Sequence, residues 1–371
     1  MKIEIMVHIP ENIQALNSYK PGKPIEEIVA DLQLKEWAIL WNNENNLGPS
    51  PKAIEAIERE TQNLHAYPDP ASVALRTSIA KVYQCSIENV VVDNGSESLL
   101  DNIFRSFMSD GNELLTCEGT FVALYIWAKA NNRKLRKLPL GRGYRFDVKR
   151  IVESITPETK AIYIANPNNP TGTIITKDEL DEMIQLVPKE VLVIIDEAYF
   201  SYANSLTDDY PDSFSLRHSN VITLRTFSKA YGLAGMRIGF ALGPKDLIEA
   251  MTKVKMTFAP SNIAQAAALA ALEDQEHMQR ALELNKKALT DFYLALHEAE
   301  LDYIPSYANF VMVDLKTEEK AKQFADELLK KGVFIRHLKA FGLPHCVRIS
   351  TGTDKENQLF IRSVKRWANS V

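Results

Sequence analysis

The chain has 371 residues, of which 46% are hydrophobic and 25% are charged, and its formal net charge at neutral pH is −5. A length of this order exceeds a single typical core and predicts two domains that share one ligand cleft. A mildly acidic chain gives no broad electrostatic reason to bind nucleic acid or an anionic membrane.

The cysteines and histidines predict neither a disulfide framework nor a metal centre. Cys85, Cys117 and Cys346 are odd in number and widely spaced, which indicates a reducing cytoplasm. The seven histidines show no HExxH or CxxC-like clustering, so we expect no metal. The start, MKIEIMVHIPENIQ, lacks the long apolar stretch of a signal peptide, and no segment reaches transmembrane length.

The first part of the chain is predicted to serve both domains. Residues 1–40 read as an N-terminal arm that joins the smaller domain, and residues 41–255 alternate strand and helix signals as the larger domain. Within the larger domain, a strand at 90–93 leads through Gly95 into an amphipathic helix. The start of that helix offers free N–H groups to an anion, although a Gly-Ser helix start is ordinary by itself.

A second strand, at 161–165, ends in a constrained loop. The loop Asn166–Gly172 reads NPNNPTG, and Asn166 sits at the strand's carboxyl end, where open α/β sheets bind ligands. A plain turn is the alternative interpretation. Two prolines and two further asparagines constrain the loop more than a turn requires.

A third apolar run, at 191–195, ends in Asp196. Five consecutive apolar residues predict a strand covered on both faces. A carboxylate at the end of such a strand needs a cationic partner, and a protonated pyridine nitrogen would serve. Tyr199 can direct a phenol to the same ring. A helix-capping Asp196 is an equally good interpretation of this segment alone.

The most informative feature is Ser228-Lys229, with Arg237 eight residues after the lysine. Lys229 follows an apolar strand and lies in a loop rich in glycine, which suits neither a surface charge nor a core residue. We interpret it as an amine that forms a Schiff base with an aldehyde cofactor, whose phosphate Ser228 and Arg237 bind. Most lysines are surface groups, so the dipeptide alone is weak evidence, and the three segments above strengthen it.

The last third of the chain is predicted to contain connecting helices followed by a second, smaller domain. Residues 256–300 are predicted to be connecting helices, at about 265–272 and 275–299. Residues 301–371 are predicted to form a small α+β domain. The expected order there is a strand at 310–313, a helix at 318–329, strands at 333–336 and 347–350, and a helix at 356–367.

Together these segments resemble the fold-type I pyridoxal-phosphate enzymes, specifically the class I/II aminotransferases, and most closely the histidinol-phosphate aminotransferase group. The resemblance covers nearly the whole chain. It implies an α/β fold, with a large domain built on a mostly parallel mixed sheet flanked by helices. The motifs that carry it are YKPG at 19–22, NENNLGPSP at 43–51, YPD at 67–69, NPNNPTG at 166–172, DEAY at 196–199, SKAYGLAGMR at 228–237 and VRISTG at 347–352.

The resemblance implies catalytic and cofactor-binding roles. Lys229 would be the Schiff-base lysine and then the base that moves the substrate's α-proton. Asp196 would pair with the pyridine nitrogen, while Asn166 and Tyr199 would hydrogen-bond the ring O3′. The other expected cofactor-binding residues are Glu97, Phe121 stacked on the ring, and for the phosphate Gly95, Ser96, Thr226, Ser228 and Arg237.

Substrate and partner follow from the same resemblance. Arg348 would bind the substrate α-carboxylate, and Arg336 the phosphate of histidinol phosphate. Tyr19 and Asn45 are expected in that substrate pocket. Tyr67 would reach the phosphate of the neighbouring subunit's cofactor, which implies a homodimer with shared active sites. Without the family pattern, surface charges would be the alternative interpretation of both arginines.

The expected reaction converts histidinol phosphate and 2-oxoglutarate to imidazole acetol phosphate and glutamate, with pyridoxal 5′-phosphate as the cofactor. Alternatives are an aromatic amino-acid aminotransferase, a phosphothreonine-type decarboxylase and a cofactor-sensing regulator. The short N-terminal arm leaves no room for the regulator's DNA-binding segment. The chain departs from the family pattern at Asn46, Gly119 and Phe121, and His337 follows Arg336 where the pattern is variable. Asn46 and Gly119 border loops that shape the substrate pocket.

Overall fold

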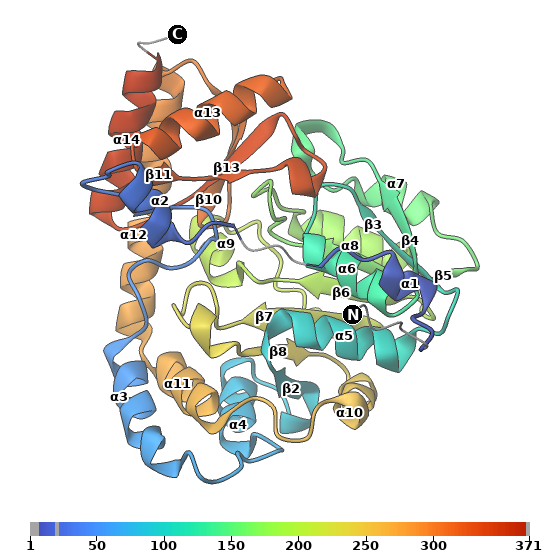
Figure 1. The fold of residues 1–371 in the computed structure, drawn as a ribbon. Coiled ribbons are helices and arrows are strands. Elements are labelled where there is room, and N and C mark those ends of the chain that lie inside the picture. The colour runs from blue at the N-terminus through green and yellow to red at the C-terminus, as the bar shows by residue number, and fades with distance from the viewer. Residues whose placement is uncertain (1–6, 19–21, 369–371) are drawn as a thin grey trace.

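A seven-stranded sheet forms the centre of the larger domain in the computed structural model, which describes residues 7–18 and 22–368 (Figure 1). β8 runs antiparallel to both of its neighbours, and the remaining neighbours pair in parallel. This confirms the expected mostly parallel mixed sheet. In sheet order, the strands are β2 (Val90–Asp93), β8 (Gly239–Leu242), β7 (Val221–Thr226), β6 (Leu192–Asp196), β5 (Thr159–Ala165), β3 (Glu113–Cys117) and β4 (Lys134–Leu138).

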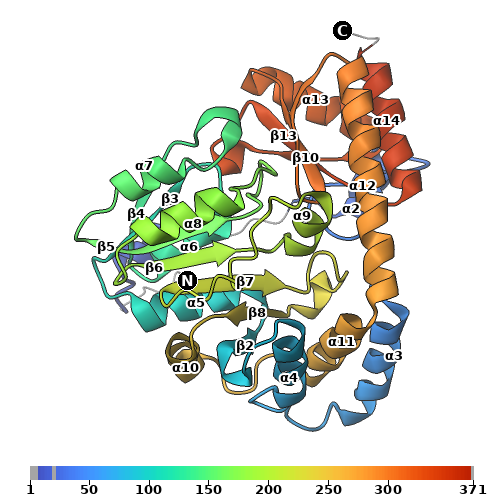
Figure 2. The same cartoon turned by 180° about the vertical axis from the view of Figure 1, so that it is seen from behind.

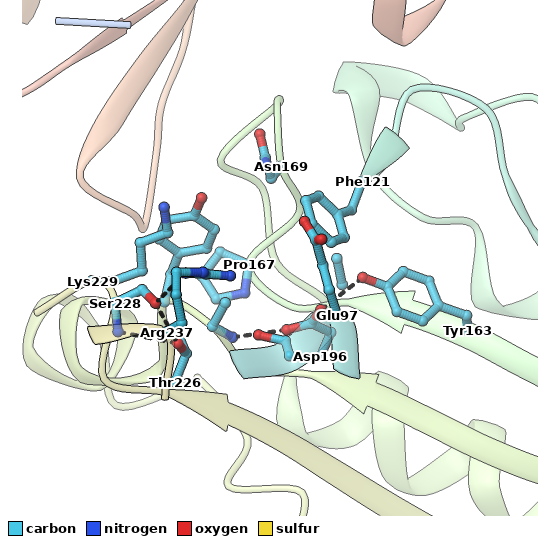
Figure 3. Close-up of a pocket in the computed structure, with 14 residues that line it drawn as sticks. Glu97, Phe121, Tyr163, Pro167, Asn169, Asp196, Thr226, Ser228, Lys229 and Arg237 are labelled. Atoms are coloured by element: carbon cyan, nitrogen blue, oxygen red, sulfur yellow. Dashed lines mark hydrogen bonds between the residues drawn. The ribbon is translucent and has the colours of Figure 1, made fainter. Parts of the chain in front are cut away.

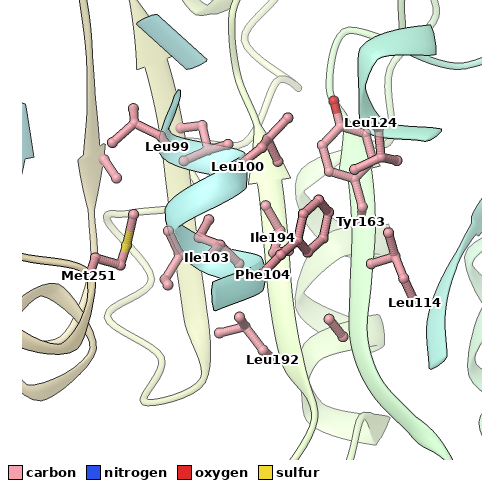
Figure 4. Packing of buried hydrophobic residues seen from close by; sticks show 14 of the residues in the cluster. Leu99, Leu100, Ile103, Phe104, Leu114, Leu124, Tyr163, Leu192, Ile194 and Met251 are labelled. Atoms are coloured by element: carbon pink, nitrogen blue, oxygen red, sulfur yellow. The ribbon is translucent and has the colours of Figure 1, made fainter. Parts of the chain in front are cut away.

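Helices cover both faces of this sheet, which is why its central strands read as unbroken apolar runs. α5, α6 and α10 pack on one face, where Leu99, Phe104 and Met251 share a core with strand residues such as Ile194 (Figure 4). α7 and α8 cover the other face, which Figure 2 shows from the front. The bounds are α5 (Gly95–Phe107), α6 (Val122–Ala130), α10 (Lys245–Val254), α7 (Val148–Glu153) and α8 (Lys177–Leu186).

The smaller domain contains a four-stranded antiparallel sheet in the order β12-β13-β10-β9. α13 and α14 pack against it, with Phe324 and Phe360 in a common core. β1 from the N-terminal segment pairs in parallel with β11 and joins this domain. The bounds are β1 (Ala38–Ile39), β9 (Asp302–Ile304), β10 (Phe310–Asp314), β11 (Val333–Phe334), β12 (Arg336–His337), β13 (Cys346–Ser350), α13 (Glu318–Lys330) and α14 (Asp354–Ala368).

The two helices between the domains differ in what they contact. α11 (Asn262–Glu273) packs on α3 and α4 and shares a core with β2 and β8, so its apolar face belongs to the larger domain. α12, Gln275–Glu298, is 24 residues long and runs from beside α11 up to α14 (Figure 2). The domain limits that we expected from the sequence remain a prediction.

The remaining described elements are short. They are α1 (Glu11–Gln14), α2 (Ile25–Asp31), α3 (Pro51–Glu60), α4 (Val73–Val82), α9 (Phe200–Leu206) and 3-10 helices at Thr61–Asn63, Ile87–Asn89, Arg142–Tyr144, Ala234–Met236 and Lys339–Phe341. No helix in the described part of the chain has both the length and the apolar character needed to cross a membrane.

One expected strand is divided. The sequence predicts a single strand at 333–336, but residues 333–334 pair with β1 while residues 336–337 pair with β13. The two halves therefore belong to different sheets. A continuous apolar run shows that this segment is extended, but it does not show which neighbour each part pairs with.

Candidate active site

A pocket opens where the carboxyl ends of β5, β6 and β7 meet the N-terminus of α5 (Figure 3). This is the edge at which open α/β sheets bind ligands, because the loops after parallel strands converge there. The lining residues are Ser96, Glu97, Phe121, Tyr163, Ala165, Pro167, Asn169, Asp196, Ala198, Tyr199, Thr226, Ser228, Lys229 and Arg237.

One side of the pocket is built to receive an anion. Asn94 makes no side-chain cap, so the first N–H groups of α5 remain available, and Gly95 has a φ of +80°. A Cβ on Gly95 would lie 3.1 Å from Arg237 Nη2, so glycine leaves room for the guanidinium. Arg237 Nη1 donates to Ser228 Oγ at 3.4 Å. A helix N-terminus beside a guanidinium and a hydroxyl is well suited to a phosphate.

The hydroxyls of this cradle are held together by the loop after β7. Thr226 Oγ1 donates to Ser228 Oγ at 3.0 Å and accepts the Ser228 N–H at 3.0 Å. Arg237 adopts left-handed backbone angles, with φ of 49°, which turns its side chain back toward Ser228. Within residues 7–18 and 22–368, Arg237 forms no ion pair, so its charge is available to a ligand.

Lys229 points into the pocket from the same loop. Its Nζ donates to the carbonyl oxygen of Asn42 at 3.2 Å and lies 5.7 Å from the centre of the Tyr199 ring. Burial, with the charges of Arg348 and Arg237 adding to it, lowers the pKa of Lys229 to about 8. The neutral, nucleophilic form of this amine is therefore far more populated near physiological pH than it is for an ordinary lysine.

Asp196 ends β6 and lines the same pocket. It is 4% exposed, and burial raises its pKa to about 6. Its Oδ1 accepts the Ala198 N–H at 3.1 Å, and its Oδ2 accepts the hydroxyl of Tyr163 at 2.8 Å. A buried carboxylate with two neutral donors and no guanidinium bound to it favours a cationic ligand group.

The aromatic residues expected at the site lie in the pocket wall. Tyr199 is buried, and its hydroxyl accepts the side-chain N–H of Asn43 at 2.8 Å. Burial raises the pKa of Tyr199, so its phenol stays protonated at neutral pH. Phe121 directly precedes α6 and presents its ring to the pocket, with Glu97 beside it (Figure 3).

One expected residue, Asn166, lies outside the pocket lining. Asn166 follows β5 as expected, but it does not line the pocket, because its amide donates to and accepts from the backbone of Ile175. Asn169, three residues later, projects into the pocket instead (Figure 3). Both side chains come from the same loop. Asn169 is thus the asparagine of this loop that faces the pocket, and the ring contact expected of Asn166 stays a prediction.

The two C-terminal arginines lie side by side on the small domain. Arg336 and Arg348 are directly opposite each other in the antiparallel pair β12–β13. Arg348 is buried, and it donates to Asn169 Oδ1 and, at 2.7 Å, to the Trp41 carbonyl. Burial, with the charge of Arg336 adding to it, lowers the pKa of Arg348 to about 10, so it remains a cation at neutral pH. Arg336 is exposed and donates to Asn42 Oδ1 at 2.8 Å.

The other predicted residues are placed as follows. The Asn45 side chain donates to the Ala230 carbonyl at 2.9 Å and so contacts the loop of Lys229 rather than the pocket. Tyr67 is 81% exposed and stacks on Phe258, with ring centres 4.3 Å apart. Tyr19 lies outside the described residues.

Two features of the site were missed by sequence reasoning. Tyr163, in the middle of β5, reaches Asp196, and its sequence signal was a single tyrosine within a β-branched strand. Residues 41–43 contact Arg348, Arg336, Lys229 and Tyr199, which makes them a bridge between the domains. Their signal was the polar run after an apolar strand.

A second group of polar residues lies between the domains. Asp314, His345 and Cys346 have potential ligand atoms within 4.8 Å of one another. The Tyr144 hydroxyl lies 3.0 Å from both Asp314 and His345, and Lys316 pairs with Asp314 at 3.1 Å. Burial raises the pKa of the Cys346 thiol to about 12. The Asp314 carboxylate of this group is thus already paired with the Lys316 ammonium.

Comparisons with known proteins agree with this geometry. The family model described as aminotransferase class I and II matches residues 35–364. A histidinol-phosphate aminotransferase 1 of Nitrosococcus oceani is 37% identical over 350 residues, covering 94% of each chain. A histidinol-phosphate aminotransferase of Caldicellulosiruptor saccharolyticus is 38% identical over 357 residues, covering 96% of this chain and 98% of the relative.

Among solved structures, the histidinol-phosphate aminotransferase from Sinorhizobium meliloti in complex with pyridoxal-5′-phosphate superposes with a TM-score of 0.90. The two chains are 28% identical, and the match covers 99% of each.

Proposed function

Because the chain belongs to the class I and II aminotransferases, we propose that it transfers the amino group of histidinol phosphate to 2-oxoglutarate. It is a pyridoxal-phosphate-dependent enzyme. The products would be imidazole acetol phosphate and glutamate.

The opposed pair of arginines carries the proposal. Like charges directly opposite each other in a sheet destabilise it, so Arg336 and Arg348 are an unfavourable arrangement without a ligand. Neither forms an ion pair with a carboxylate within the described ranges, 7–18 and 22–368. A substrate with a doubly charged anionic group would relieve this repulsion. Histidinol phosphate brings a phosphate, and glutamate brings two carboxylates.

The pocket fits pyridoxal phosphate. The uncapped start of α5, the space left by Gly95 and the unpaired Arg237 match its phosphate, while Asp196 and Lys229 line the same pocket. When bound, the cofactor accepts the electron pair that is left on a substrate carbon when that carbon loses its proton. The lysine, with its lowered pKa, supplies the amine that holds the aldehyde.

The residues around the ring would then have separate tasks. Asp196, buried and anionic, would keep the ring nitrogen protonated. Tyr199 and Asn169 would donate to the ring oxygen, and the hydrogen bond from Arg348 to Asn169 ties this contact to the substrate-binding arginine. Once released from the cofactor, the neutral amine of Lys229 would take the proton from the substrate carbon. It would then deliver that proton to the cofactor.

The assembly and the compartment are part of the proposal. Tyr67, Met256 and Phe258 are large, exposed and close together, which suits a surface buried in a homodimer. In such a dimer Tyr67 would complete the phosphate site of the neighbouring subunit. The cytoplasm is the proposed compartment, supported by three cysteines that form no disulfide.

A substrate panel tests the proposed reaction. Histidinol phosphate, phenylalanine and other amino acids are each incubated with 2-oxoglutarate, and glutamate formation is followed. We expect kcat/KM to be highest for histidinol phosphate. A higher kcat/KM for phenylalanine would instead assign the enzyme to aromatic amino acids.

The variant Arg336→Ala tests the phosphate contact. Losing a charge-assisted contact costs about 1.5–3 kcal/mol, so kcat/KM for histidinol phosphate should fall about 10- to 100-fold. Phenylalanine, which carries no phosphate, should lose far less. Arg362→Ala is the matched control, because Arg362 is an exposed arginine of the same domain that pairs with Glu36. Equal losses on both substrates would contradict the assignment.

A further inference from the structure

Tyr163 connects the core of the larger domain to the active site. It lies on β5 opposite Ile194 of β6, while Asp196 lies opposite Ala165. The phenol therefore reaches along the sheet and across to the next strand, where its hydroxyl donates to Asp196 Oδ2 at 2.8 Å (Figure 3). The tyrosine thus lines the pocket while its ring belongs to the core.

The surroundings of Tyr163 leave its ring little freedom. The residue is fully buried in the cluster that contains Phe104, Leu124 and Ile194 (Figure 4). Its carbonyl accepts the hydroxyl of Thr116 at 2.8 Å, which ties β5 to β3 at this point. Closely packed side chains occupy single rotamers, so the hydroxyl has a fixed position. Burial also raises the pKa of Tyr163 well above its ordinary value, so the group acts only as a neutral phenol.

The Asp196 carboxylate receives one donor on each oxygen. Ala198 N–H binds Oδ1 at 3.1 Å, and the phenol of Tyr163 binds Oδ2. Together the two donors fix the plane of the carboxylate, because they hold opposite ends of it. Each oxygen keeps a lone pair that is free for a ligand. The Ala198 N–H comes from the turn that follows Asp196, whereas the Tyr163 hydroxyl comes from the neighbouring strand β5.

We propose that Tyr163 is a positioning residue that holds the Asp196 carboxylate toward the ring nitrogen of the cofactor. This inference rests on the proposed function, since it takes Asp196 as the partner of that nitrogen. A hydrogen bond to the charged form of an acid stabilises that form. The phenol therefore also favours leaving the shared proton on the ring nitrogen rather than on the carboxylate.

The test compares two cofactors on the cofactor-free enzyme. Pyridoxal phosphate and its 1-deaza analogue, which has a CH group in place of the ring nitrogen, are titrated into wild type and Tyr163→Phe. We expect Kd for pyridoxal phosphate to rise about tenfold in the variant, which corresponds to about 1.4 kcal/mol. Kd for the analogue should not change, since it offers Asp196 no N–H group.

Tyr125→Phe is the matched control. Tyr125 packs against the same core and its hydroxyl donates to the Cys117 carbonyl at 2.7 Å, but it does not contact Asp196. This variant should bind both cofactors as wild type does. A loss shared by both cofactors, or by both tyrosine variants, would show that the phenol acts only on packing and would overturn the proposal. An unchanged Kd in Tyr163→Phe would overturn it as well.

A second variant removes the acceptor charge. In Asp196→Asn, the further change Tyr163→Phe should alter Kd for pyridoxal phosphate less than twofold, because a positioning role acts only through the carboxylate. A tenfold loss that persists in this background contradicts the inference. If wild type itself failed to bind pyridoxal phosphate through Lys229, the proposed function would fall too. Wild-type binding with an unaffected Tyr163→Phe overturns the positioning role alone.

Discussion

At the scale of single residues, the site depends on charges that are buried without full compensation. Lys229 is close to two guanidinium groups, and Asp196 is held by neutral donors only. Burial shifts each group toward its neutral form, compared with the same group in water. Each group can act once a ligand binds with a complementary group beside it. The same environment that makes these residues costly for the empty protein therefore prepares them for a cofactor.

The lowered pKa of Lys229 predicts its reactivity. Only the neutral amine reacts with acylating reagents, and burial beside Arg348 lowers the pKa to about 8. In the cofactor-free protein, trace acetylation of Lys229 should rise with pH and level off a little above pH 8. An ordinary lysine keeps gaining reactivity to about pH 10.4. Peptide-level mass spectrometry measures both in one sample, with the exposed Lys253 as the reference.

Arg348→Met provides the control for that experiment. It removes one of the cations that lower the pKa of Lys229, so the midpoint of acetylation should move to higher pH. A wild-type midpoint near pH 10.4, the ordinary value for a lysine, would show that burial does not lower the pKa of Lys229.

At the scale of elements, the loop after β7 is positioned by close backbone contact. Gly232 has a φ of +69°, and a Cβ there would lie 2.7 Å from the carbonyl carbon of Gly48 and 3.0 Å from Pro49 N. The loop that carries Lys229 thus lies directly against the segment at 43–51. Glycine is needed on both counts, for its backbone angles and for the space.

Gly232→Ala should therefore destabilise the protein by about 3 kcal/mol or more, from left-handed backbone strain and a contact that the backbone cannot relieve. The control is Gly111→Ala, because Gly111 has a similar φ of +80° but nothing within 4 Å of the added Cβ. It should cost only about 1 kcal/mol. Urea unfolding measures both, and equal losses would show that strain alone matters at Gly232.

Local patterns in the sequence predict elements well and contacts between elements less well. β5, β6 and α5 lie within two residues of the expected positions, because apolar runs and helical spacing are properties of one segment. The sequence did not show that Asn169 rather than Asn166 lines the pocket, because this depends on the path of the loop. Asn168 is bonded to Gly119, and Gly172 to Tyr307, and these partners lie far away in the sequence. Tyr163 was missed for the same reason.

At the scale of the whole molecule, one surface is more apolar than a free monomer needs. Tyr67 and Phe258 stack on each other while 81% and 45% exposed, and Met256 beside them is 70% exposed. Such patches usually mark an interface. In the proposed homodimer this surface would be buried, and Tyr67 would reach the partner's cofactor site.

Phe258→Asp should therefore dissociate the enzyme, because a carboxylate would have to be buried in the interface. Sedimentation equilibrium should show the mass of one chain, against two for wild type. The separated chains should also release pyridoxal phosphate more readily, since each would lack the partner's tyrosine. Leu186→Asp is the control, because Leu186 is equally apolar and 58% exposed but ends α8, on the opposite side of the sheet. A Phe258→Asp protein that stays dimeric would place the interface elsewhere, and a dissociated protein with unchanged cofactor affinity would contradict the shared site.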